Sequence, residues 1–231
     1  MNKIQVEGQI NKVKDIQINK DTFIDIDGSN ITLNITQTKK ANVFIKIISS
    51  KLTLNITQTD NLIINIFTVN TSLTTKVDII KDNLSLKYTY STINEKENKY
   101  KIDVNHLGNN INSQITSHGI NLKESLSFKI NAVVPKTSKG IVTNQDSKII
   151  LEDGIAQIKP NLLVDIDEVE ANHSAYIGEF KEEDLFYLKT RGLNEKQGIN
   201  LLAKSFLMGQ MSITFRERNI ILEILKRYWR W

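Results

Sequence analysis

The chain of 231 residues contains no cysteine, and it has only two prolines and ten glycines. Without thiols it forms no disulfide framework, cysteine-ligated zinc site or thiol nucleophile, and it has no thiolate of its own for an iron–sulfur cluster. No apolar run approaches the roughly 18 residues of a membrane span. The first ten residues, MNKIQVEGQI, lack the apolar segment of a secretory signal. We therefore expect a cytoplasmic protein that binds no membrane.

Apolar and polar residues alternate strictly along most of the chain before about residue 158. Because successive side chains of a strand point to opposite faces, each run predicts a strand with one apolar face. The prevalence of β-branched isoleucine favours the same structure. A β domain is predicted for residues 1–178. The alternating runs include Ile31-Leu33-Ile35, Leu52-Leu54-Ile56, Leu62-Ile64-Ile66 and Leu126-Phe128-Ile130.

One internal repeat indicates how these strands are arranged. The segment TLNITQT at 32–38 recurs at 53–59, an offset of 21 residues. A period of about 20 residues is typical of a β-solenoid, whose coils place equivalent residues above one another. An antiparallel sandwich remains the alternative, although its hairpins favour Asn-Gly and Asp-Gly turns, which are scarce here. The polar segment STINEKENKY at 91–100 predicts an exposed loop between coils.

Three short helices are predicted for residues 179–231, which form a second domain. The first carries acidic residues in its first turn and stops near Gly192. The second and third begin at capping boxes, Asn194 with Gln197 and Thr214 with Glu217.

The net charge of +4 lies in this helical part, because residues 181–231 contain ten basic and six acidic side chains. Solvated helix faces explain such a charge, and an acidic protein partner is the functional alternative. The excess is small for a protein that binds nucleic acid, so none is expected as a partner.

Residues with catalytic or metal-binding chemistry are few. His106, His118 and His173 have no partner at the spacing of a known metal motif. His106 and His118 are expected in surface loops. The sequence has no phosphate-binding loop, nucleophile elbow or dinucleotide turn. These residues favour a β-rich binding or scaffold protein over an enzyme.

Four short motifs follow one another in the last third of the chain. In order and spacing they resemble the C-terminal signature of the SufB/SufD family, the core proteins of the SUF system of iron–sulfur cluster assembly. The resemblance spans residues 160–209, and a looser one covers residues 144–156. The motifs are PNLLV at 160–164, ANHSA at 171–175, EEDLFYL at 182–188 and the pair Arg191-Gly192.

The resemblance implies a right-handed parallel β-helix followed by a small helical domain. It also implies a dimer with a SufB-like homologue or a second copy, and a SufC-type ABC ATPase docked on the C-terminal helices. Candidate ATPase contacts are Phe186, Tyr187, Arg191 and Leu202. The alternative for the apolar residues, including Phe186, Leu202 and Phe206, is packing against the β-helix.

His173 matches the histidine of the family's A-S-H motif, which implies an iron or cluster contact at a subunit interface. The family's scaffold subunit needs a cysteine thiolate, which this chain lacks. Histidine, carboxylate and hydroxyl groups alone are a poor ligand set for a cluster. The chain is therefore interpreted as a non-catalytic SufD-like subunit that binds no cofactor alone. It would complete a site whose thiolate comes from a SufB-like partner.

Two other functions remain open. One is a β-solenoid binding module that keeps the fold without the assembly role. The other is a solenoid enzyme acting on polysaccharide, which would need a cleft lined by carboxylates. The polar positions of the predicted strands are mostly threonine, asparagine and lysine, which disfavours the enzyme.

Overall fold

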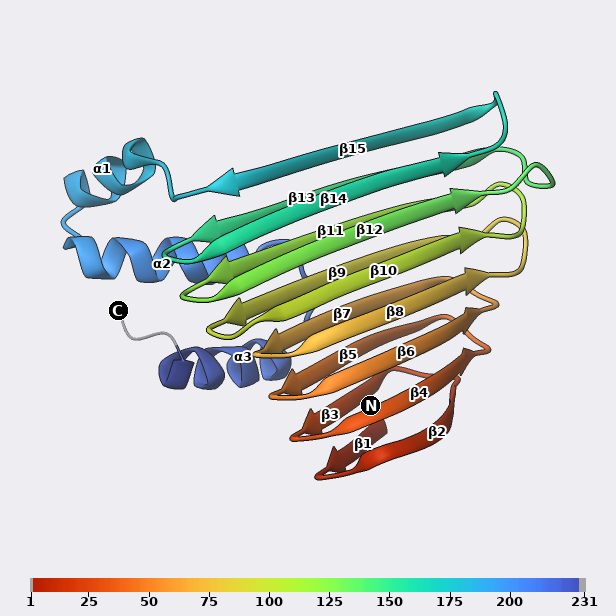
Figure 1. Ribbon diagram of the computed structural model, residues 1–231, viewed down its shortest axis with the longest axis horizontal. Coiled ribbons are helices and arrows are strands. Elements are labelled where there is room, and N and C mark those ends of the chain that lie inside the picture. The colour runs from red at the N-terminus through yellow and green to blue at the C-terminus, as the bar shows by residue number, and fades with distance from the viewer. Residues whose placement is uncertain (1, 229–231) are drawn as a thin grey trace.

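A computed structural model describes residues 2–228 of the chain. Within this range fifteen strands come first and three helices follow (Figure 1). Odd-numbered strands form one sheet and even-numbered strands form the other. Neighbouring strands in both sheets are parallel, so each coil of the chain contributes one strand to each sheet. The predicted parallel β-helix is confirmed.

The strands lengthen along the stack. The odd-strand sheet contains β1 (Asn2–Glu7), β3 (Thr22–Asp27), β5 (Ala41–Ile48), β7 (Leu62–Val69), β9 (Ser85–Asn94), β11 (Asn112–Asn121), β13 (Ile141–Leu151) and β15 (Val169–Gly178). The even-strand sheet contains β2 (Ile10–Ile18), β4 (Asn30–Gln37), β6 (Lys51–Gln58), β8 (Ser72–Ile79), β10 (Asn98–His106), β12 (Ser125–Val134) and β14 (Ile155–Val164).

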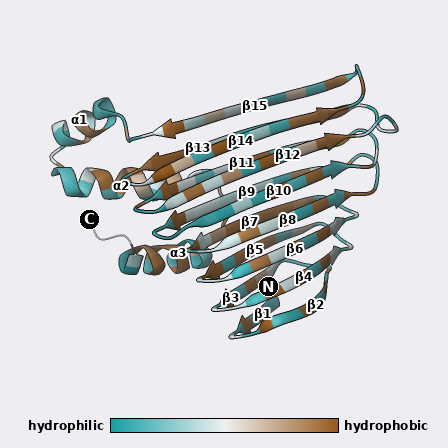
Figure 2. Ribbon diagram, in the orientation of Figure 1, coloured by the Kyte–Doolittle hydropathy of each residue, from teal (hydrophilic) through white to brown (hydrophobic). Residues whose placement is uncertain are grey.

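The two copies of TLNITQT stack directly on one another in β4 and β6. Leu33 pairs with Leu54 and Asn34 with Asn55. Both leucines are fully buried inside the coils, while outside them Asn55 Nδ2 donates to Asn34 Oδ1 at 2.9 Å. Figure 2 shows the resulting alternation of hydrophobic and hydrophilic residues along the strands. The sequence repeat therefore corresponds to one coil, which excludes the sandwich.

The turns after the first four odd-numbered strands share one backbone geometry. Gly8, Gly28, Ser49 and Asn70 all have positive φ angles. Their N–H groups donate to carbonyls at the end of the strand in the next coil. Glycine adopts this left-handed geometry freely, and asparagine adopts it more easily than most other residues. Asparagine therefore takes the place of glycine at several turns, which explains how a chain of many turns needs few glycines.

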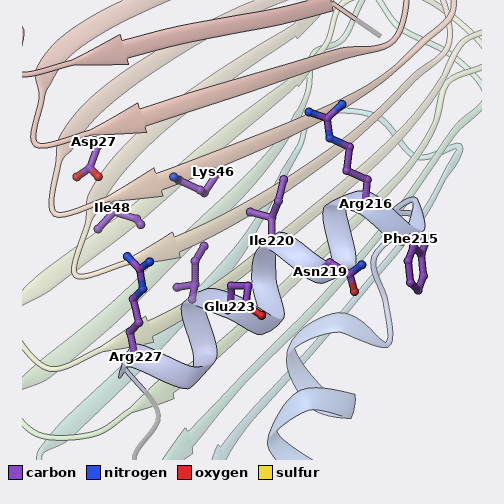
Figure 3. Close-up of a pocket in the computed structure, with 10 residues that line it drawn as sticks. Asp27, Lys46, Ile48, Phe215, Arg216, Asn219, Ile220, Glu223 and Arg227 are labelled. Carbon is purple, nitrogen blue, oxygen red and sulfur yellow. The ribbon is translucent and has the colours of Figure 1, made fainter.

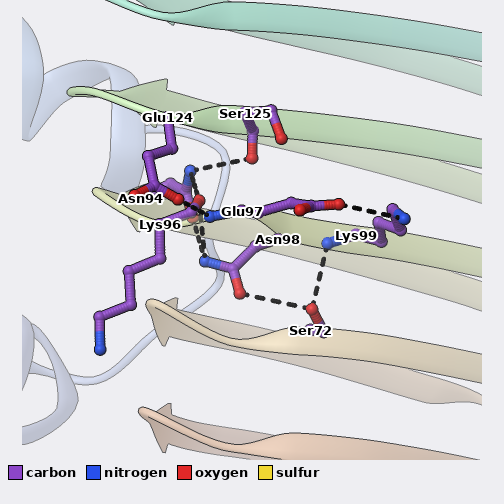
Figure 4. Close-up of polar contacts among 8 residues, drawn as sticks. All are labelled: Ser72, Asn94, Lys96, Glu97, Asn98, Lys99, Glu124 and Ser125. Carbon is purple, nitrogen blue, oxygen red and sulfur yellow. Dashed lines mark hydrogen bonds and ion pairs between the residues drawn. The ribbon is translucent and has the colours of Figure 1, made fainter.

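Buried amide side chains fill the corner between the two sheets. Asn94 Nδ2, at the end of β9, donates to Asn121 Oδ1 at 2.7 Å and to Ser125 O at 3.3 Å. Asn98 Nδ2 donates to Asn94 Oδ1 in the same corner (Figure 4). Where a chain turns, its backbone groups lose their strand partners and need other ones. These amides supply the missing partners, so burial of the corner leaves few backbone groups without hydrogen bonds and costs little free energy.

Two predictions about polar residues are wrong. The segment 91–100 is not a long exposed loop, because only residues 95–97 separate β9 from β10. His106 and His118 do not lie in surface loops either: they are 0% and 5% exposed, at the end of β10 and within β11. Polar residues usually indicate exposure, but in a stack of coils a buried polar side chain finds hydrogen-bond partners on the neighbouring coil.

The helices α1 (Glu182–Thr190), α2 (Glu195–Met208) and α3 (Phe215–Tyr228) follow β15. Both predicted capping boxes form: Gln197 N donates to Asn194 Oδ1 at 2.9 Å, and Thr214 N donates to Glu217 Oε2 at 2.7 Å. The predicted C-terminal helical segment is confirmed, while its separation into a domain of residues 179–231, apart from residues 1–178, stays a prediction. No helix within residues 2–228 is long and apolar enough to span a membrane.

Apolar side chains join α2 and α3 to the outer face of the odd-strand sheet. Full burial of such a side chain stabilises the fold by roughly 1.5–3 kcal/mol. The helices therefore form one packed layer with this sheet. The layer contains Phe23, Phe44, Phe67, Ile93 and Ile120 from the strands and Ala203, Leu207, Ile221, Ile224 and Leu225 from the helices.

Candidate functional site

The β-helix ends in an open coil formed by β14 and β15, which we term the terminal coil. Each of these strands is the edge of its sheet and has a strand partner on one side only within residues 2–228. Ile158 and Val164, on the inner side, are only partly buried, and Leu163 and Ile177 are exposed. Unpaired strand edges beside exposed apolar side chains are surfaces that proteins usually cover.

The opposite end of the β-helix, formed by β1 and β2, is rich in charge. Ile10 and Val13 are exposed there as well, but charged side chains on an edge strand oppose pairing with another sheet. The two strands of the terminal coil carry only Lys159 and Glu170. The terminal coil is therefore the end better suited to bind a second β-rich protein. The charged residues of β1 and β2 are Lys3, Glu7, Lys12, Lys14 and Asp15.

His173 lies midway along β15, in register with Gln145 of β13. The side chain of Gln145 is buried within the stack, and the pairing gives His173 the same inward direction. His173 is nevertheless exposed, because no further coil within residues 2–228 covers it.

The donor atoms around His173 do not fit an iron–sulfur cluster by themselves. In the described part of the chain, no three His, Asp or Glu side chains are close enough together to hold a metal ion. His173 offers one nitrogen donor, beside the amide of Asn172 and the hydroxyl of Ser174. A cluster held here would need thiolate ligands from another chain.

The residues predicted to contact an ATPase lie on α1, directly after α1 and on α2. Phe186 and Tyr187 are 69% and 56% exposed. The Arg191 guanidinium carbon lies 5.2 Å from the centre of the Tyr187 ring, which is a cation–π contact. Leu202 is partly buried on α2. The alternative of packing is therefore wrong for Phe186, whereas Phe206 does pack against the layer of helix and strand side chains.

The candidate residues belong to two separate surfaces. One is the terminal coil with His173 in the middle of its edge strand. The other, which we term the helical surface, consists of Phe186, Tyr187, Arg191 and Leu202. Figure 1 shows α1, which contains Phe186 and Tyr187, beyond the end of β15, whereas His173 lies midway along that strand. The structure brings Tyr187 and Arg191 into contact but does not join them to His173.

Sequence reasoning missed the polar side chains that hold α2 to the sheet. Ser91 Oγ donates to Leu207 O and His118 Nδ1 donates to Phe206 O, each at 2.8 Å. Both carbonyls belong to the last turn of α2, where carbonyl groups have no partner within the helix. The strands thus complete the end of a helix that is about 90 or more residues away in sequence. No local sequence signal announces such a contact.

A serine–histidine pair lies inside the β-helix. His106 Nε2 is 2.8 Å from Ser113 Oγ, which donates to Thr143 Oγ1 at 2.8 Å, and His106 Nδ1 is 3.0 Å from Val133 O. Burial lowers the pKa of His106, although its hydrogen bond to the Val133 carbonyl opposes this effect. Both side chains of the pair are fully buried. The pair therefore joins neighbouring coils and offers no hydroxyl to a substrate.

A cavity of about 550 Å³ lies between α3 and the odd-strand sheet (Figure 3). Asp27, Lys46 and Ile48 line it from the strands, and Ile220 and Arg227 line it from the helix. It contains charges of both signs and no histidine among its lining residues. This composition does not correspond to a metal site or to a known catalytic arrangement.

Comparison with known proteins identifies the family. The SufBD core domain of the SUF system of FeS cluster assembly matches residues 27–206, well over half of the chain. The chain belongs to the SufBD family. The resemblance predicted from the motifs is therefore confirmed, and it extends through most of the β-helix.

Individual relatives match shorter segments. An iron–sulfur cluster assembly SufBD family protein of Pyrococcus horikoshii is 33% identical over 97 residues, which are 38% of this chain and 22% of that protein. The iron–sulfur cluster assembly protein SufD of Bacillus subtilis is 26% identical over 117 residues, 49% of this chain and 26% of that protein. SufD of Escherichia coli is 27% identical over 90 residues, 38% of this chain and 20% of that protein. The matched segments thus span a fifth to a quarter of these relatives.

Proposed function

We propose that the chain is a non-catalytic, SufD-like subunit of a SUF iron–sulfur cluster assembly complex. It pairs through the terminal coil with a SufB-like homologue that carries cysteine, or with a second copy of itself. It binds a SufC-type ATPase through the helical surface. The observation that carries this proposal is an unpaired coil end whose two strands carry only two charged side chains, with His173 in the middle of its edge strand.

The terminal coil suits pairing with another β-helix. A partner's edge strands would bond to the free N–H and C=O groups of β14 and β15 and extend both sheets. Such pairing would bury Ile177, which is in register with the buried Ile149 of β13 and which solvent now reaches. Because His173 lies midway along β15, its imidazole would meet donor groups of both chains at the seam. The partner would supply the thiolates that a cluster requires and this chain lacks.

The helical surface suits a protein partner. Aromatic side chains and arginine contribute most to binding at protein interfaces, and Phe186, Tyr187 and Arg191 are exposed together on and next to α1. Residues 181–208 carry five basic and four acidic side chains, so the net charge of this surface does little to select the partner.

Co-expression of the tagged full chain with a SufB-like homologue and a SufC-type ATPase tests the proposal. Ala175→Lys should remove the homologue and keep the ATPase, while the matched edge variant Ile4→Lys, which is also on the inner side of an edge strand but at the opposite end, should keep both. The double variant Tyr187→Ala with Arg191→Ala should lose the ATPase and keep the homologue. His173→Ala should keep both proteins but lower the iron and sulfide content of the purified complex.

Two results would contradict the proposal. One is that the wild-type chain captures neither protein. The other is that Ala175→Lys and Ile4→Lys reduce capture of the homologue equally, which would remove the special role of the terminal coil. Either result would favour a β-solenoid module that keeps the family fold without the assembly role.

A further inference from the structure

A chain of side chains connects α2 to the edge strand β15 across the outer face of the odd-strand sheet. His118 on β11 donates from Nδ1 to Phe206 O at 2.8 Å, and its ring stacks on the Phe206 ring with centroids 4.4 Å apart. Asp146 on β13 comes next, with Oδ2 3.7 Å from His118 Nε2. Its other oxygen, Oδ1, accepts a hydrogen bond from Ser174 Oγ of β15 at 2.5 Å. Contacts thus run from α2 through three adjacent strands to the neighbour of His173.

One of these contacts, between His118 Nε2 and Asp146 Oδ2, is not a hydrogen bond. The Phe206 carbonyl only accepts hydrogen bonds, so neutral His118 carries its proton on Nδ1 and a lone pair on Nε2. This buried Nε2 has no hydrogen-bond partner within residues 2–228, and its distance of 3.7 Å from Asp146 Oδ2 is too long for a hydrogen bond. A lone pair on Nε2 forms no hydrogen bond with a carboxylate, because both groups are acceptors. A proton on Nε2 would turn the same atom into a charged donor directed at Asp146.

The groups around His118 act on its charged form in opposite directions. Burial is the largest effect and brings the pKa of His118 below its ordinary value of 6.5. The Phe206 carbonyl and Asp146 raise this pKa, and Lys148, the other charged group facing it from β13, lowers it. The carbonyls in the last turn of α2 also carry partial negative charge, which favours a cation there. The residue of β15 that contacts Asp146 is Ser174, which is uncharged.

Asp146 stays ionised near neutral pH. Burial raises the pKa of this carboxyl, but hydrogen bonds from Ser174 and Lys148 outweigh burial and bring the pKa below its ordinary value. The acceptor for a proton on Nε2 is therefore already in place when the histidine is neutral. Only the protonation of His118 changes the link.

We propose that His118 and Asp146 are positioning residues that couple α2 to the edge strand β15, and that a proton on Nε2 of His118 tightens the coupling. The biological meaning rests on the proposed function, because α2 belongs to the helical surface and β15 to the terminal coil. A partner that binds the helices would then alter the order of β15. By thermodynamic reciprocity, pairing at β15 would alter α2 to the same extent.

Amide hydrogen exchange of the full chain without partners tests the coupling. Protection is expressed relative to unstructured peptide at the same pH, and it is measured at pH 5 and pH 8. Ser174→Ala removes the hydrogen bond that joins β15 to Asp146. Asn172→Ala is the matched control, because Asn172 Nδ2 donates to Asn144 Oδ1 at 3.1 Å between the same two strands but away from His118.

Ser174→Ala should lower protection in the last turn of α2 by about fivefold at pH 5, the low end of typical coupling between sites. At pH 8 the effect should be smaller, and Asn172→Ala should leave α2 unchanged at both pH values. In a His118→Asn background, which keeps an N–H donor for the Phe206 carbonyl, the effect of Ser174→Ala should no longer depend on pH.

Equal effects of Ser174→Ala and Asn172→Ala on α2 would overturn the coupling. The same effect of Ser174→Ala at both pH values would overturn the role of the proton, and the comparison remains decisive even where His118→Asn does not fold. No arm uses a partner protein. Failure to capture an ATPase would therefore refute the proposed function. It would not affect the result of the exchange experiment, which tests the coupling independently.

Discussion

Replacing Leu54 by alanine tests the stacking of the coils. Leu54 is fully buried and lies in register between Leu33 of the preceding coil and Thr75 of the following coil. Backbone hydrogen bonds hold these strands about 4.8 Å apart, so the neighbouring coils are unable to move into the space of the lost side chain. Loss of the buried atoms together with an unfilled cavity should destabilise the fold by about 3–5 kcal/mol, the upper part of the range for such changes.

Urea unfolding followed by circular dichroism measures this loss. Thr53→Ala is the matched control, because Thr53 is adjacent, points outward and is only partly buried; its replacement should cost less than about 1 kcal/mol. A repeat protein can lose coils locally, so amide exchange in β4 and β8 should increase as well. Equal losses in the free energy of unfolding for the two variants would refute the reasoning. They would indicate that Leu54 is not on the inner side, as a shift of one residue in register would cause.

Two further predictions concern the interior of the coils. Gly119→Ala should destabilise the protein by about 1–3 kcal/mol, because its Cβ would lie 2.7 Å from Leu126 Cδ2 and 2.8 Å from Phe128 Cζ; an unchanged urea midpoint would contradict this steric argument. Burial lowers the pKa of His106 below the ordinary value of 6.5, so the unfolded chain takes up the proton first as pH falls. The contribution to stability is therefore present above pH 6.5 and lost as pH falls through the folded-state pKa. His118 adds a loss of the same sign. His106→Gln should flatten the fall of the urea midpoint between pH 7 and pH 5, and an unaltered slope would rule out this histidine as a cause.

Features that depend on neighbours in sequence were predictable. The capping boxes at Asn194 and Thr214 join residues three positions apart, so the sequence alone contains both partners of each contact. The repeat of TLNITQT predicted a coil of 21 residues because a solenoid places equivalent residues in register. His173 was identified as a candidate by its motif, although its role at the terminal coil stays a prediction.

Features that depend on packing were harder to predict. Phe186 and Phe206 are both aromatic residues in helical segments, yet one is exposed and the other stacks on His118. His106 and His118 lie in polar stretches typical of loops, but their hydrogen-bond partners come from segments that are distant in sequence. Local composition does not reveal whether such a partner exists.

The sequence by itself determined the strand alternation, the 21-residue length of the repeated coil, the helix boundaries, the family motifs and the absence of a thiolate. Only the tertiary structure decided that His173 lies in an edge strand of an open coil, apart from the helical surface, and that His118 links α2 to the strands beneath it. The physical reason is the range of the interactions. Side-chain periodicity and helix capping act over a few residues, whereas burial of a polar group and exposure of an edge depend on which distant segments become neighbours.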